Sequence, residues 1–91
     1  MPMPSSLILS QVRAYIQENF LYAMPNLVLQ DEDHLMKKGV IDSIGVAELL
    51  AFLEEEFGIT VADTEITEHN LGSLSAIAAF VERKRTAQSA G

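Results

Sequence analysis

The chain has 91 residues, a net charge of −7 and no cysteine. A chain of this length can bury one small core and is too short for a two-lobed enzyme with a deep cleft. Hydrophobic residues make up 48% and charged residues 21%, which is typical of a folded domain rather than a disordered one. We therefore expect one domain over residues 1–91, with an ordered core at about 6–86. The lack of cysteine excludes disulfides, thiolate catalysis and a cysteine-ligated zinc site.

The apolar runs of the chain are short, and its first residues, MPMPSSLILS, lack the basic start and long apolar core of a signal peptide. We therefore expect no membrane span and a cytoplasmic location. No feature demands more than a monomer.

Acidic residues dominate the second half of the chain. No Lys or Arg lies between Lys38 and Arg83. The acidic residues in that interval are Asp42, Glu48, Glu54, Glu55, Glu56, Asp63, Glu65, Glu68 and Glu82. Such a field repels phosphate backbones and attracts basic protein surfaces, so nucleic acid is not an expected partner. The alternative is a solvated acidic surface with no partner.

Helical periodicity starts near the N-terminus. Apolar residues spaced by three and four predict a first helix over about 6–22, with Ser5 or Ser6 as its cap; they are Leu9, Val12, Ile16 and Phe20. Residues 23–41 then form a connection that is long for a plain loop, so part of it should pack on the core. The expected anchors are Leu27, Val28, Leu29 and Leu35.

A second helix is predicted from Asp42 or Ser43 to about Phe57, with Gly58 as the stop signal. One face should be buried: Val46, Leu49, Leu50, Leu53 and Phe57. A different face should be exposed: Ile44, Glu48, Ala51 and Glu55.

Two further helical segments follow in the sequence. A short turn is expected over 65–70, with Asp63 or Thr64 as its cap and Gly72 after it. Ser73 should cap a last helix with a buried stripe of Leu74, Ile77, Ala78 and Val81. Its basic residues, Arg83, Lys84 and Arg85, should complement the C-terminal dipole. The fold class is therefore all-α, a small bundle of three main helices and one short one, with a long loop between the first two.

The dipeptide Asp42-Ser43 is the main candidate site. Asp42 is a good N-cap, which puts Ser43 at the first helical position, where backbone N–H groups lack intrahelical partners. A phosphate group on an exposed Ser43 hydroxyl would lie beside those donors and the positive end of the helix dipole. We expect Gly45 to keep the approach to it open. The plain alternative is ordinary helix capping.

Two other kinds of site are poorly supported. A catalytic serine would need His34 or His69 as its base, and the chain has neither the elbow motif nor an oxyanion-hole signature of such enzymes. The segment DEDHLMKK is not a calcium loop, because Met36 stands where glycine is required. We expect no bound metal.

The longer stretch GVIDSIGVAELLAFLEEEFGI closely resembles the core motif of acyl carrier proteins and their peptidyl carrier relatives. The resemblance extends over about 35–83, including ITEHNLGSLSAIAAFVERK, and the first helix matches only in pattern. It implies that Ser43, preceded by Asp42, is esterified by 4′-phosphopantetheine, transferred from coenzyme A by a phosphopantetheinyl transferase. The arm ends in a thiol, so the sulfur missing from the chain is supplied. The protein itself would catalyse nothing.

The same resemblance implies the partners. They are the transferase, an acyl- or aminoacyl-activating ligase, and downstream synthases or transferases with basic patches that dock on Asp42, Ile44, Glu48, Ala51 and Glu55. Ile44 stands where the fatty-acid-synthesis carriers have a leucine after the serine. Ala51 stands where they often have a larger apolar residue. Gly39-Val40-Ile41 and ITEHNLGSLSAI look more like freestanding carriers that serve dedicated ligases.

The cargo stays open at this point. It could be a fatty or polyketide acyl group, or an activated amino acid as in nonribosomal peptide synthesis, held as a thioester. Whether it enters the bundle beside Leu50, Leu53 and Phe57 is open too. The competing hypotheses are a helical protein–protein adaptor without a prosthetic group and a small hydrolase using Ser43.

Overall fold

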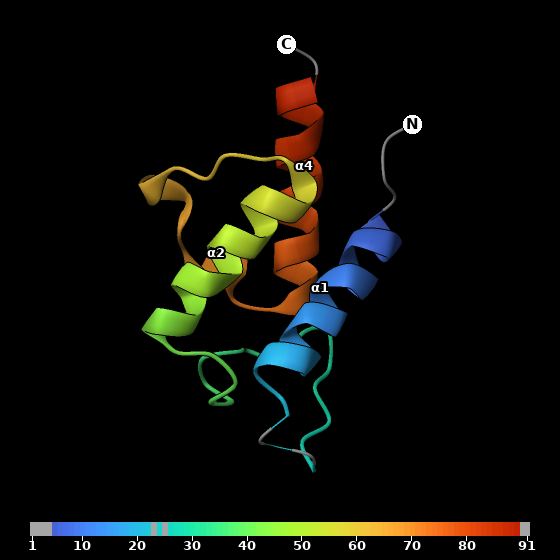
Figure 1. Ribbon diagram of the computed structural model, residues 1–91, viewed down its shortest axis with the longest axis vertical. Coiled ribbons are helices and arrows are strands. Elements are labelled where there is room, and N and C mark those ends of the chain that lie inside the picture. The colour runs from blue at the N-terminus through green and yellow to red at the C-terminus, as the bar shows by residue number, and fades with distance from the viewer. Residues whose placement is uncertain (1–4, 23, 25, 90–91) are drawn as a thin grey trace.

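The computed structural model describes residues 5–22, 24 and 26–89, and the described part is helical without strands. The helices are α1 (Ser5–Asn19), α2 (Ser43–Phe57), α3 (Glu68–Leu71) and α4 (Leu74–Ser89), with a 3₁₀ turn, η1, at Asp63–Glu65. In Figure 1, α1 and α4 lie side by side and run in opposite directions, and α2 crosses in front of α4. The predicted all-α fold, with three long helices, a short one and a long loop after the first, is confirmed.

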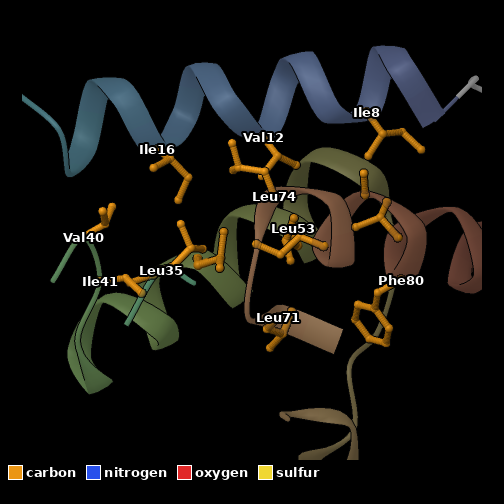
Figure 2. Packing of buried hydrophobic residues seen from close by; sticks show 14 of the residues in the cluster. Ile8, Val12, Ile16, Leu35, Val40, Ile41, Leu53, Leu71, Leu74 and Phe80 are labelled. Atoms are coloured by element: carbon orange, nitrogen blue, oxygen red, sulfur yellow. The ribbon is translucent and has the colours of Figure 1, made fainter. Parts of the chain in front are cut away.

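The core forms where one apolar face of each long helix packs against the others. Figure 2 shows the α1 residues Ile8, Val12 and Ile16 pointing at Leu74 of α4, Leu53 of α2 and Leu35 of the long loop. The stripe predicted for α4 is buried throughout, and from α2 the buried set is Leu49, Leu53 and Phe57. Leu9, Val46 and Leu50 are only partly buried. Ile8, which the predicted stripe left out, is fully buried in the place expected for Leu9.

The long loop is fixed to the bundle by backbone and side-chain hydrogen bonds. The Leu35 N–H donates to the Gly72 carbonyl at 2.8 Å, and the Ser75 N–H donates to the Asp31 carbonyl at 3.0 Å. Arg13 of α1 donates to the Leu29 carbonyl at 2.7 Å and pairs with the Asp31 carboxylate. These bonds join the loop to α1 on one side and to the residues around the start of α4 on the other. They hold it across the end of the bundle.

The predicted loop anchors are partly right. Leu29 and Leu35 are buried, and Leu27 is partly buried. Val28 is exposed, so its prediction as an anchor is wrong. Leu29 is held at the bundle, where its carbonyl accepts from Arg13, whereas the side chain of the preceding Val28 is 74% exposed.

Three predicted helix boundaries or caps are wrong. Helix α1 ends at Asn19 rather than near 22, because the N–H groups of Phe20 and Leu21 both donate to the Ile16 carbonyl and close the helix. It begins at Ser5, so Ser5 and Ser6 are helical residues rather than caps. The expected turn over 65–70 is divided into η1 and α3, and Thr67, not Asp63 or Thr64, caps α3 by accepting from the Asn70 N–H at 3.2 Å.

The basic residues of α4 do not complement its C-terminal dipole, because the helix continues to Ser89. Two of them instead connect α4 to the segment before it. Arg83 donates to the Asn70 side chain at 3.0 Å, and Lys84 donates to the Glu65 carboxylate at 2.8 Å. The hydrogen bonds from Lys84 and from the Ala62 N–H lower the pKa of Glu65 below its ordinary value. These bonds hold η1 and α3 against α4.

Gly45 has a packing role that the sequence interpretation missed. The sequence predicts that Gly45 lies beside the approach to Ser43. In the structure it is buried on the inner side of α2 instead. A Cβ atom at this position would lie 2.7 Å from Ile41 Cγ1 and 2.9 Å from Phe20 Cε1. Only glycine therefore lets the start of α2 approach the loop and the end of α1 this closely.

We predict that Gly45→Val lowers the free energy of unfolding by about 1–3 kcal/mol, because the added Cβ atom and its two methyl groups must displace Ile41 and Phe20. The measurement is urea denaturation followed by circular dichroism. Ala47→Val is the matched control, since Ala47 is exposed in the same helix and should lose at most about 0.7 kcal/mol in helix propensity. Equal losses in the two variants would contradict the packing role of Gly45.

Candidate functional site

The first turn of α2 has the geometry expected from Asp42-Ser43. Asp42 is extended, with φ −116° and ψ −174°, and its Oδ1 accepts from the Gly45 N–H at 2.8 Å. Its carbonyl accepts from the Val46 N–H at 2.9 Å, which is the first bond of the helix. Asp42 is therefore the N-cap and Ser43 the first helical residue. At that position the N–H groups of Ser43 and Ile44 have no partner within the helix.

Ser43 is exposed, although the residues two positions before and two positions after it are buried. Ile41 lies two residues before it and Gly45 two residues after it, and both face the core. Gly39, with φ +73°, turns the loop so that the Val40 N–H donates to the Leu35 carbonyl at 2.9 Å. The chain thus enters α2 from a fixed loop, and the serine side chain is presented at the end of the helix.

The four residues predicted as the exposed face of α2 form one surface stripe, which we call the α2 stripe: Ile44, Glu48, Ala51 and Glu55. Their spacing of four and three places them on one side of the helix. Ile44 is 73% exposed, which is unusual for a large aliphatic side chain in a small domain. Burial, and secondly the charge of Glu48, raise the pKa of Tyr15 on α1, so this carboxylate lies near the α1 side of the stripe.

Aromatic rings join α2 to α1 below this surface. The Tyr15 and Phe52 rings are stacked, with centroids 4.0 Å apart and planes 11° apart. Phe20 packs edge-on against Tyr15, and Phe57 packs edge-on against Phe52. Such pairs contribute about 0.5–1.5 kcal/mol each beyond the area they bury. They hold the orientation of α2 and therefore the direction in which its first turn points.

A pocket of about 170 Å³ lies beside the first turn of α2, between α2, α3 and the long loop. It is lined by His34, Met36, Ile41, Val46, Ile66, Thr67, Glu68, Leu71 and Gly72. We call it the α2–α3 pocket. Its walls are mainly apolar, and the sequence interpretation did not find it because its residues come from three separate segments.

Within the described residues, the structure shows no hydrogen bond between Ser43 and a histidine. His34 lies 3.4 Å from the Glu68 carboxylate, and His69 is exposed on α3. No cluster of His, Asp or Glu able to hold a metal ion is found in the described part of the chain. In the same residues, no helix is both long and apolar enough to cross a membrane.

A small helical bundle that exposes a capped serine at a helix start is a suitable scaffold for a tethered group. Comparison with known families agrees, because residues 10–81 match the family described as phosphopantetheine attachment site. A similar protein is the D-alanyl carrier protein of Abiotrophia defectiva, 34% identical over 59 residues, which are 64% of this chain and 75% of that protein. The chain belongs to the phosphopantetheine-binding carrier family.

Membership of this family settles two predictions made from the sequence. The prosthetic group is covalently attached 4′-phosphopantetheine, and the protein is a non-catalytic carrier. The residues at the start of α2 fit such a group, because an exposed hydroxyl stands beside N–H donors and the positive end of the α2 dipole. The hypotheses of an adaptor without a prosthetic group and of a small hydrolase are therefore wrong.

We predict that Asp42→Ala lowers the free energy of unfolding by about 1 kcal/mol, because the Gly45 N–H loses its acceptor. Asp42→Asn should retain most of the stability, since the amide oxygen can accept the same hydrogen bond. Chemical denaturation of the three proteins measures both. An Asp42→Ala variant as stable as the parent would mean that the cap does not hold the first turn.

Proposed function

We propose that Ser43 carries the 4′-phosphopantetheine arm and that the protein transports an aminoacyl group as a thioester on that arm. The observation that carries this proposal is the exposed Ser43 side chain at the first position of α2, within a fixed turn capped by Asp42. When bound, the arm supplies the terminal thiol that forms the thioester. The chain's own residues hold the phosphate end of the arm and present it to other enzymes.

Ser43 is distinguished from another serine at a helix start. Ser73 precedes α4, but its hydroxyl accepts from the Ala76 N–H at 3.1 Å and the residue is half-buried. Ser43 has Asp42 before it to make the corresponding cap bond, so its hydroxyl is left for modification. This division of labour, in which one residue caps and the next is exposed, supports Ser43 as the attachment site.

The proposed cargo is inferred from the similar protein and not from the geometry of Ser43. The similar protein from Abiotrophia defectiva is a D-alanyl carrier protein, which favours an aminoacyl cargo over a fatty or polyketide acyl group. An aminoacyl cargo requires an aminoacyl-activating ligase to load it and a transferase to receive it. A cytoplasmic location, where coenzyme A and such a ligase are supplied, belongs to this proposal.

The α2 stripe is the proposed docking surface for these partners. It combines one highly exposed apolar side chain, Ile44, next to Ser43, with the carboxylates of Glu48 and Glu55 further along the helix. An apolar contact with an acidic border suits a partner whose own site is apolar and bordered by Lys or Arg. Charge attraction raises the association rate without making the complex long-lived, which suits a carrier that must leave each enzyme.

The proposed function is tested by the intact mass of the chain isolated from its own cells at acidic pH, which preserves thioesters. We expect the mass of the chain plus the arm, and a second species heavier by one amino acid that hydroxylamine removes. Ser43→Ala should show neither addition. A fatty or polyketide acyl mass on the arm would overturn the proposed cargo but leave the attachment site intact.

Ser73→Ala is the matched control for that experiment, because it removes another hydroxyl at a helix start. It should keep the arm in full and lose about 1 kcal/mol of stability with the lost cap bond. An arm that persists in Ser43→Ala, or disappears from Ser73→Ala in a folded chain, would overturn Ser43 as the attachment site.

We predict that Glu48→Lys and Glu55→Lys slow loading by the transferase and by the ligase about three- to tenfold at low salt, because each reverses a charge that steers docking. The measurement is kcat/KM with the carrier as the varied substrate. The difference from the parent should shrink at 1 M salt, where the screening length is about 3 Å.

Glu82→Lys is the control, since Glu82 is exposed on α4 beside the groove shared with α1 rather than on the α2 stripe. It changes the net charge equally and should leave loading rates within about twofold of the parent, because its charge lies outside the proposed docking surface. Equal slowing by all three variants would show that net charge, and not the α2 stripe, governs docking.

A further inference from the structure

The α2–α3 pocket combines an apolar wall with a polar rim. Val46, Ile66 and Leu71 contribute apolar side chains, and Ile66 is itself partly exposed at 39%. The rim is formed by His34 from the long loop and Glu68 from α3. A half-open apolar pocket with a few convergent polar groups has the chemistry of a small-molecule site.

The pocket opens next to the proposed attachment residue. Two of its lining residues, Ile41 and Val46, lie two positions before and three positions after Ser43. Residues separated by three positions share a side of a helix, about 5–6 Å apart between Cβ atoms. A flexible group tethered to Ser43 can therefore fold back over Val46 and reach the pocket.

The hydrogen-bond acceptor at the rim is the Glu68 carboxylate, which the His34 imidazole faces. The Lys37 N–H donates to His34 Nδ1 at 3.4 Å, which in a neutral imidazole places the proton on Nε2. Nε2 lies 3.4 Å from Glu68 Oε2, is itself buried, and makes no hydrogen bond within the described residues. The imidazole N–H therefore faces the carboxylate without fully engaging it.

Glu68 keeps most of its acceptor capacity. Its side chain is 73% exposed, and a carboxylate can accept from several donors at once. Among the described residues, no ion pair joins it to a lysine or an arginine. A cationic group at the pocket rim would meet an accessible carboxylate.

We propose that the α2–α3 pocket binds the α-ammonium group of the aminoacyl cargo, with Glu68 as its acceptor and His34 as a positioning residue for Glu68. The inference rests on the proposed function, since the arm on Ser43 delivers the cargo to the pocket. The side chain of a small amino acid then contacts Val46 and Ile66. An acyl group without an amine gains only the apolar contact, so the pocket discriminates aminoacyl cargo from simple acyl cargo.

The test compares two loaded forms of the full chain, an alanyl and a propionyl thioester, which differ only in whether the amine or a hydrogen stands on the α-carbon. We expect the alanyl form to shift the backbone amide resonances of Glu68 and His34 and the methyl resonances of Val46 and Ile66 more than the propionyl form. We also expect the alanyl thioester to hydrolyse about two- to fivefold more slowly in the parent than in Glu68→Gln, the range that one exposed ion pair supplies.

Glu56→Gln is the matched control, because it removes one exposed carboxylate from α2 without touching the pocket. It should leave both the resonance differences and the hydrolysis rate unchanged, whereas His34→Gln should reduce the alanyl effect partly. Circular dichroism confirms that each variant is folded.

The outcomes separate this inference from the proposed function. A chain whose mass shows the loaded arm, but whose alanyl and propionyl forms give equal shifts in the parent and in Glu68→Gln, overturns the pocket and leaves the carrier function intact. A chain on which no loaded mass forms at Ser43 overturns both. Larger alanyl shifts that disappear in Glu68→Gln and persist in Glu56→Gln establish the ammonium site.

Discussion

The exposure of Ser43 depends on the burial of Gly45. The start of α2 is pressed against Phe20 and Ile41 so closely that a Cβ atom at residue 45 would stand within 3 Å of both. Because successive helical residues point in directions 100° apart, seating residue 45 inward leaves residue 43 toward solvent. A helix that packed less closely could rotate about its axis and take the serine with it. The close contact therefore fixes the orientation of the site as well as the stability of the turn.

Local capping chemistry explains why the geometry of the first turn of α2 was predictable from the sequence. Asp42, Ser43 and Gly58 act on neighbours within a few residues, so the N-cap bond and the stop at φ +66° follow from residue type. The buried face of α4 was predicted in full for the same reason, since one face of a helix repeats every three or four residues, and on α2 the prediction holds for Leu49, Leu53 and Phe57. These features need no knowledge of what the helix packs against.

The features that were missed are contacts between distant segments. Lys84 donates to Glu65, 19 residues away, instead of complementing the end of its own helix, and Arg13 holds the Leu29 carbonyl beside the exposed Val28. The role of Gly45 required the position of Phe20, and the α2–α3 pocket required the placement of His34 beside Glu68. No period or cap in the sequence encodes these distances, so only the folded chain shows them.

The two surfaces beside Ser43 make opposite demands, and the structure separates them on α2. The α2 stripe carries exposed carboxylates and the exposed side chain of Ile44, which suits short-lived contacts with partner enzymes. Val46, two residues beyond Ile44, turns instead to the α2–α3 pocket. A tethered group can move from one side to the other by rotation about the bonds of the arm, without any change in the bundle. Partner docking on the α2 stripe, as proposed, therefore need not compete for the pocket residues proposed to hold the cargo.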